Sequence, residues 1–101
     1  MIHREEVLFK GPANYIRNIE AVGGNIEITD KSILFESHKI NVQSGAISIP
    51  LEHISHYKLG NSLGFIPNRI TIITNKGVQY KFVVSKRKEI IRILDELLNK
   101  N

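Results

Sequence analysis

The sequence predicts a mainly β protein that ends in one C-terminal α-helix, and three observations define this class. Apolar and polar residues alternate with period two over much of residues 7–84, as half-buried strands require. Turn residues interrupt this alternation about every 8 to 12 residues, which gives about seven short antiparallel strands. After Val84 the apolar spacing becomes that of an amphipathic helix. We therefore expect a single domain over residues 1–101, with its core in residues 7–98.

The clearest early strands are residues 25–29 and 32–36, which together form a hairpin. Their inward side chains are Ile26, Ile28, Ile33 and Phe35. Before them, residues 7–10 form a candidate first strand, and residues 14–22 are interpreted as extended. Gly23-Gly24 is interpreted as a hinge or bulge beside the strand that follows.

Two further strands, residues 46–51 and 54–59, precede the most regular hairpin of the chain. Pro50 lacks the N–H group that a strand ladder needs, so the first of these strands is expected to end there. The hairpin begins near residue 68 or 69 and turns at Asn75-Lys76-Gly77, whose glycine supplies the positive φ that this connection needs. Its returning strand places these side chains on the inner face: Val78, Tyr80, Phe82 and Val84.

Ser85 is the predicted N-cap of the terminal helix. The apolar stripe of this helix consists of Ile90, Ile91, Ile93, Leu94, Leu97 and Leu98. Burial of side chains of this size stabilises a fold by about 1.5 to 3 kcal/mol each. The helix is therefore expected to lie against the strands as a lid or plug.

Composition narrows the class of protein. The chain has no cysteine, so disulfides and thiolate metal sites are excluded. No apolar run approaches the roughly 20 residues that cross a bilayer, and the N-terminus shows no export signal, so we expect no transmembrane segment and a cytoplasmic location, with peripheral membrane attachment as an option. The net charge of +4 arises from 14 basic and 10 acidic residues spread along the chain, an excess that favours acidic partners without naming one.

Residues 24–35, with Thr29-Asp30-Lys31 at a turn, begin a pattern that continues through residues 38–45, 49–54 and 80–84. This pattern resembles the GRAM family of the pleckstrin-homology-like (PH-like) superfold. The resemblance implies seven strands in two nearly orthogonal sheets, closed into a barrel whose open end the helix plugs. It also implies a binding module that engages lipid head groups or protein partners.

No local motif supplies catalytic or metal chemistry. A catalytic centre needs a nucleophile or an acid–base pair with an orienting partner, and none is visible, so we expect neither an enzyme nor a cofactor. His53 and His56 should point to opposite faces of an extended segment and lack a third ligand, so no metal site is expected. Residues 60–64 contain no lysine and precede no helix, which excludes a phosphate loop.

Basic residues are the candidate ligand-binding positions. The connections after the first and third strands should share one rim, because alternate turns of a meander lie at the same end. The rim candidates are Lys10, Arg17, His38 and Lys39. A second group, Lys86, Arg87 and Lys88, is expected in the first helical turn, either as an anion site or as a solvated cluster. Weak contact with anionic lipid and an ordinary charged surface are both open interpretations.

The segment Leu63-Gly64-Phe65-Ile66-Pro67 is apolar inside an expected polar connection. Either it folds under to cover the barrel, as the family resemblance implies, or it stands out as a hydrophobic contact. If Phe65 and Ile66 are exposed, they become candidates for membrane insertion or self-association.

The leading interpretation is a non-catalytic binding module that docks, weakly, on an anionic membrane surface or on a protein partner. An alternative is a homo-oligomeric assembly protein that uses strand edges or the loop 63–67. A weak nucleic-acid binder, suggested by the basic balance, ranks third. Only 7% of the residues are aromatic, and none alternates with lysine in a stacking pattern.

Overall fold

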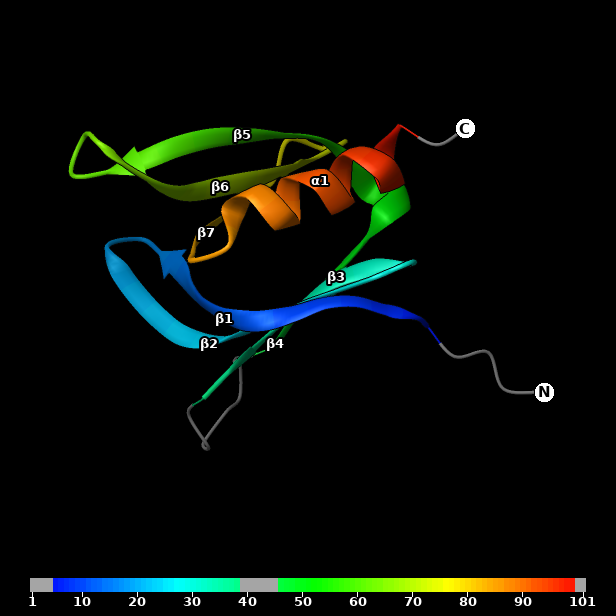
Figure 1. The fold of residues 1–101 in the computed structure, drawn as a ribbon, viewed down its shortest axis with the longest axis horizontal. Coiled ribbons are helices and arrows are strands. Elements are labelled where there is room, and N and C mark those ends of the chain that lie inside the picture. The colour runs from blue at the N-terminus through cyan, green and yellow to red at the C-terminus, as the bar shows by residue number, and fades with distance from the viewer. Residues whose placement is uncertain (1–4, 39–45, 100–101) are drawn as a thin grey trace.

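The computed structural model describes residues 5–38 and 46–99 (Figure 1). Within these residues, seven strands lead into one C-terminal helix. The strands are β1 (Val7–Arg17), β2 (Glu20–Thr29), β3 (Ser32–Ser37), β4 (Ala46–Pro50), β5 (Ile54–Ser62), β6 (Ile66–Thr74) and β7 (Gln79–Val84). The helix is α1 (Arg87–Leu98), and a 3-10 turn, η1 (Leu51–His53), joins β4 to β5. The predicted mainly β class with a terminal helix is confirmed.

All seven strands belong to one antiparallel sheet with the order β4-β3-β2-β1-β7-β6-β5. Two meanders, β1 to β4 and β5 to β7, are joined where β1 pairs with β7. The sheet curls into a half-barrel with β4 and β5 at its edges, and α1 lies between the two meanders (Figure 1). This arrangement confirms the predicted PH-like architecture of seven antiparallel strands and a covering helix, but the strands form one curled sheet with two edges instead of two sheets closed into a barrel.

Alternation along the strands builds the core as the sequence predicts. The inward side chains of β2 and β3 are Ile26, Ile28, Ile33 and Phe35, all of them buried. Phe35 packs with Tyr15 of β1 and Phe82 of β7, and the three ring centroids lie 5.5 to 5.9 Å apart. Because these rings come from β1, β3 and β7, their packing links the two meanders across the junction.

The helix covers the core with Ile90, Ile93 and Leu94. Asp95 on its outer side accepts a 2.7 Å hydrogen bond from the Tyr57 hydroxyl of β5. This hydrogen bond, with some desolvation and the negative charge of Asp95, raises the pKa of the Tyr57 phenol above its ordinary value. The contact fastens α1 to the edge strand of the sheet.

The expected N-cap of the helix is wrong. Lys86 occupies the N-cap position, and no side chain caps the first turn. The carbonyl of Lys86 accepts the N–H of Ile90 at 3.1 Å, so the helical hydrogen bonding begins one residue after Ser85. Lys86 therefore precedes the first helical turn instead of lying within it.

Two predicted turns lie where the sequence placed them. At the β2/β3 turn, the Thr29 hydroxyl oxygen accepts the N–H groups of Lys31 and Ser32 at 3.1 and 3.0 Å. At the β6/β7 turn, Gly77 has a φ of +85°, which a residue with a Cβ rarely adopts. Pro50 ends β4, as expected of a residue that cannot donate to the ladder.

Three local expectations are wrong. Gly23-Gly24 forms no bulge or hinge, because β2 passes through both glycines with unbroken register to β1 and β3. The strand β6 begins at Ile66, earlier than expected, since Ile66 already pairs with Ser62. Val78 lies before β7 and is 48% exposed, because its N–H donates to the Thr74 hydroxyl within the turn.

Candidate functional site

The most unusual exposed feature is the tip of the β5/β6 hairpin, residues 62–66, which we call the β5/β6 tip. The Phe65 N–H donates to the Ser62 carbonyl at 3.2 Å and closes a four-residue turn. Its two central residues, Leu63 and Gly64, have φ values of +54° and +83°. Positive φ at both central positions defines a type I′ turn, the form that suits the twist of a hairpin.

The side chains of this tip are apolar and face solvent. Leu63 is 81% exposed and Phe65 is 73% exposed, and Ile66 beside them is also exposed. Of the two alternatives for residues 63–67, the structure therefore shows the exposed one, and the burial that the family resemblance implies is wrong. The hairpin carries these residues beyond the part of the sheet that α1 covers, so no core lies within reach (Figure 1).

A network of side chains holds the stem of this hairpin in place. The Arg87 Nη1 group donates to the carbonyls of Gly60 at 2.8 Å and of Arg69 at 3.2 Å. The Ser62 hydroxyl donates to Asn68 Oδ1 at 2.7 Å and accepts from the Arg69 Nε group at 3.2 Å. Arg87 is half-buried in this contact, so its guanidinium braces the hairpin against the start of α1.

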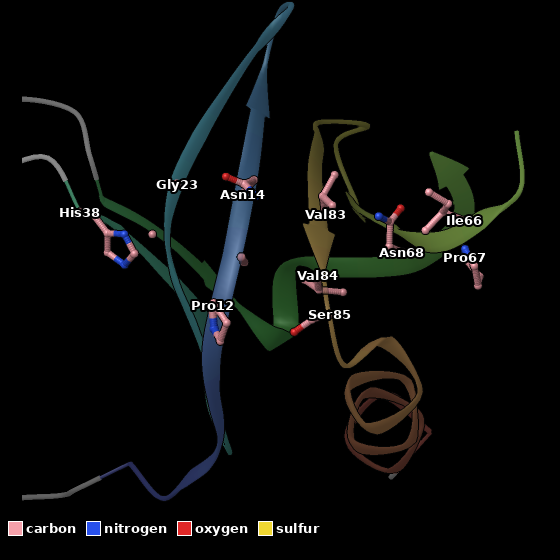
Figure 2. A pocket seen from close by; sticks show the side chains of 12 residues that line it. Pro12, Asn14, Gly23, His38, Ile66, Pro67, Asn68, Val83, Val84 and Ser85 are labelled. Carbon is pink, nitrogen blue, oxygen red and sulfur yellow. The ribbon is translucent and has the colours of Figure 1, made fainter. Parts of the chain in front are cut away.

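The second hairpin, β1/β2, projects toward the same end of the molecule as the β5/β6 tip, at the left of Figure 1. Ile19 at its turn is fully exposed. A cleft of about 700 Å³ lies between the walls of the two hairpins, with Pro12 and Gly23 on one side and Ile66 and Asn68 on the other (Figure 2). Among the described residues that line it, His38 is the sole basic side chain.

Basic residues are concentrated in the part of the chain that builds β5 to β7 and the start of α1. Residues 53–88 contain no Asp or Glu, although the chain has ten of them. The same segment holds half of the fourteen Lys and Arg residues, namely Lys58, Arg69, Lys76, Lys81, Lys86, Arg87 and Lys88. The strands β5 to β7 themselves therefore carry basic side chains and no acidic ones, although Asp95 of α1 contacts Tyr57 on their inner face, whereas both charge signs mix over β1 to β4.

Three of these residues form a strip on the outer face of β5, β6 and β7, which we call the cationic strip. Lys58 and Lys81 both pair with Thr71, and Arg69 lies two residues nearer the β5/β6 tip on the same strand. All three alternate with the inward-facing core residues, so they point away from α1. The strip thus crosses β5, β6 and β7, and Arg69 lies on its side nearer the apolar tip.

The expected rim of basic residues is only partly present. Lys10 pairs with Glu27 in the middle of β1, far from any turn, because β1 continues to Arg17 instead of ending near residue 10. Arg17 is exposed at the β1/β2 turn, and His38 lies at the cleft, where its N–H donates to the Gly23 carbonyl at 3.0 Å. Lys39 lies outside the described residues.

The basic group at the helix start is also divided. Lys86 and Lys88 are exposed, whereas Arg87 donates to backbone carbonyls of the hairpin. The Nη1 group of Arg87 therefore has a structural role, which distinguishes Arg87 from its two exposed neighbours. Lys86 and Lys88 remain candidates and add to the charge near the hairpin stem.

Sequence reasoning missed the segregation of charge. The acidic and basic residues appeared spread along the chain, yet the long interval between Glu52 and Glu89 without an acidic residue is visible in the sequence itself. Sequence reasoning also missed the brace formed by Arg87, which no local pattern indicates. The partners of Arg87 are backbone carbonyls from two strands, and their position depends on the fold.

The described residues offer neither a metal site nor a membrane-spanning helix. Within residues 5–38 and 46–99, no group of three or more His, Cys, Asp or Glu side chains could hold a metal ion. His53 lies in η1 and His56 on β5, where the His56 Nδ1 atom is 2.9 Å from the Ser55 hydroxyl. No helix in the described part of the chain has the length and apolar character to span a membrane.

Solved structures of the same architecture are PH-like half-barrels. The C-terminal domain of an unknown protein from Leishmania infantum superposes with a TM-score of 0.81 at 18% identity, over 95% of this chain and 86% of that one. The N-terminal PH domain of human ARAP2 gives a TM-score of 0.71 at 20% identity, over 90% and 78%. The Slm1 PH domain, solved with inositol-4-phosphate, gives 0.62 at 10% identity, over 94% and 95%. These likenesses establish the fold class.

The chain belongs to the GRAM domain family, whose family model matches residues 2–101. This match confirms the resemblance found in the sequence. No curated protein gives a significant match to the chain.

Proposed function

We propose that this GRAM domain is a non-catalytic docking module that binds an anionic membrane surface through the β5 to β7 half of its sheet. The observation that carries the proposal is the absence of acidic residues from residues 53–88, the segment that holds both the cationic strip and the exposed Lys86 and Lys88. Basic clusters of this kind are attracted to anionic lipid by about 1 kcal/mol per Lys or Arg near the surface.

The fold is compatible with this role. A PH domain of the same architecture was solved with inositol-4-phosphate bound, and PH domains also occur in complexes that contain human RhoA. Both a lipid head group and a protein are thus partners to consider. The row of basic side chains on the outer face of β5 to β7 favours the lipid surface, because a membrane presents negative charge over an extended plane.

Self-association through strand edges is less well supported by the same structure. The edge strand β5 has register irregularities near both ends, between Ile54 and His56 and between Gly60 and Ser62. Lys58 lies between them, and the other edge strand ends at Pro50. Bulges, lysine and proline are features that discourage pairing between sheet edges. A nucleic acid offers phosphates to the strip, but the tip presents one aromatic side chain, Phe65, and no series of aromatic residues on which successive bases could stack.

A charge-matched pair of variants tests the proposal by sedimentation with vesicles. We expect wild-type protein to bind phosphatidylcholine vesicles that contain phosphatidylserine and to bind pure phosphatidylcholine vesicles much less. The double variant Lys58→Gln/Lys81→Gln should lose about 2 kcal/mol of binding free energy, roughly a 30-fold loss of affinity.

The control for this experiment is Lys10→Gln/Lys31→Gln, which removes the same two charges from exposed positions among the acidic residues of β1 to β4. It should bind nearly as wild type. Binding that ignores phosphatidylserine, or an equal loss in both double variants, would contradict docking through the cationic strip.

A further inference from the structure

The backbone at Leu63 is the starting observation. Within the described residues, two residues other than glycine have a positive φ: Asn18 at +58° and Leu63 at +54°. Asparagine tolerates this left-handed conformation because its short polar side chain can hydrogen-bond locally, whereas leucine incurs a steric cost there. Both hairpins therefore have a positive φ at the first residue of their turn. Asparagine suits this conformation in the β1/β2 turn, and leucine does not suit it in the β5/β6 turn.

Nothing within the described chain compensates for this cost. Leu63 is 81% exposed, so its side chain gains almost no burial from the conformation that it adopts. Asparagine or glycine at this position would satisfy a type I′ turn better and would leave no apolar surface in water. Backbone strain that no interaction within the protein offsets is typical of functional sites, which contact a ligand or partner.

The tip is also held rigidly. Arg87 braces the stem from the helix, and the Ser62 hydroxyl links Asn68 and Arg69 across the turn. The neighbouring Phe65, 73% exposed, projects from the same turn. A pre-shaped apolar tip loses little conformational entropy when it inserts into a partner.

The positive charge near the tip indicates that its partner is anionic. Lys58 and Arg69 lie on the two strands that lead to it, and the whole hairpin lacks acidic residues. A second copy of the chain would bring one cationic hairpin against another, which is unfavourable. An anionic membrane combines negative charge at its surface with an apolar layer directly below, so it matches both features.

We propose that the β5/β6 tip is a preformed wedge, with Leu63 and Phe65 entering the apolar layer of an anionic membrane while the cationic strip contacts its surface. This inference rests on the proposed function and specifies which residues insert. It explains why a leucine occupies position 63, although the leucine does not stabilise the fold.

The variant Leu63→Asn tests the wedge because it should move stability and binding in opposite directions. Asparagine relieves the strain, so we expect the melting temperature to rise by about 4 °C, and loss of the apolar side chain should weaken binding to phosphatidylserine-containing vesicles by about tenfold. The control is Val78→Asn, a partly exposed residue at the opposite end of β6, which should bind as wild type.

The outcomes separate the two levels of the proposal. Wild-type protein that binds neither vesicle overturns the proposed function and the wedge with it. Wild-type protein that binds, with Leu63→Asn binding equally well, overturns the wedge alone. A fall in melting temperature for Leu63→Asn overturns the argument from strain, because the leucine would then stabilise the fold.

Discussion

Replacement of Leu94 by alanine should lower the free energy of unfolding by about 3 kcal/mol, the largest loss expected from a single helix residue. Leu94 is completely buried between the two meanders, where it packs with Ile90 and Ile93. Removal of its branched end leaves a cavity. The strands around it are hydrogen-bonded to their neighbours, so they cannot move inward to fill it. The loss would be measured by urea denaturation followed by circular dichroism.

The control for this variant is Glu96→Ala on the exposed face of the same helix. Since that side chain packs on no core, the change should stay within about 0.5 kcal/mol. A loss below about 1 kcal/mol for Leu94→Ala would mean that the helix does not plug the half-barrel.

The variant Gly24→Ala should destabilise the fold by a similar amount, about 3 kcal/mol, for a different reason. A Cβ at this position would lie 2.1 Å from the Glu36 carbonyl oxygen and 2.8 Å from Cζ of Phe35. The first contact is with backbone in a paired strand, which cannot rotate away as a flexible side chain could. Relief requires that β2 and β3 separate locally or that the strand pairing shifts.

The neighbouring variant Gly23→Ala is a matched control. The added methyl group would point to the outer face, where its nearest atom, the Asn14 Oδ1, is 3.4 Å away, an ordinary contact. We expect less than about 1 kcal/mol of change in either direction. Equal denaturation midpoints for the two alanine variants would contradict the close approach of β2 and β3 at Gly24.

Much of the fold could be predicted because its local patterns are unambiguous. Ile26, Ile28, Ile33 and Phe35 alternate so regularly that one shift of register would expose the whole set, and the structure buries all four. Gly77 and Pro50 act through their own covalent geometry, which is independent of tertiary context. These elements therefore follow from neighbouring residues alone.

The wrong expectations share a dependence on distant parts of the chain. Gly24 resembles a bulge in the sequence, but it is required by a carbonyl of β3. The role of Arg87 is set by the carbonyls of Gly60 and Arg69, which lie 27 and 18 residues away. Exposure of Leu63 and Phe65 depends on how far the β5/β6 hairpin extends past the helix, which apolar periodicity does not encode.

The candidate site was accordingly foreseen in part. Phe65 and Ile66 were singled out as contacts if exposed, and the structure exposes both. The cationic strip required strand pairing before Lys58 and Lys81 could be placed in one row. Lys10 lies away from the predicted rim because β1 continues to Arg17 instead of ending near residue 10.

The most direct test of membrane docking uses the absence of cysteine from the sequence. A single cysteine introduced by Phe65→Cys, or by Lys31→Cys at the β2/β3 turn, can be labelled with an environment-sensitive fluorophore. On addition of phosphatidylserine-containing vesicles, the label at position 65 should shift to the blue and brighten, and the label at position 31 should not change. A bound protein whose label at position 65 stays in water, or whose label at position 31 enters the membrane instead, would contradict the account.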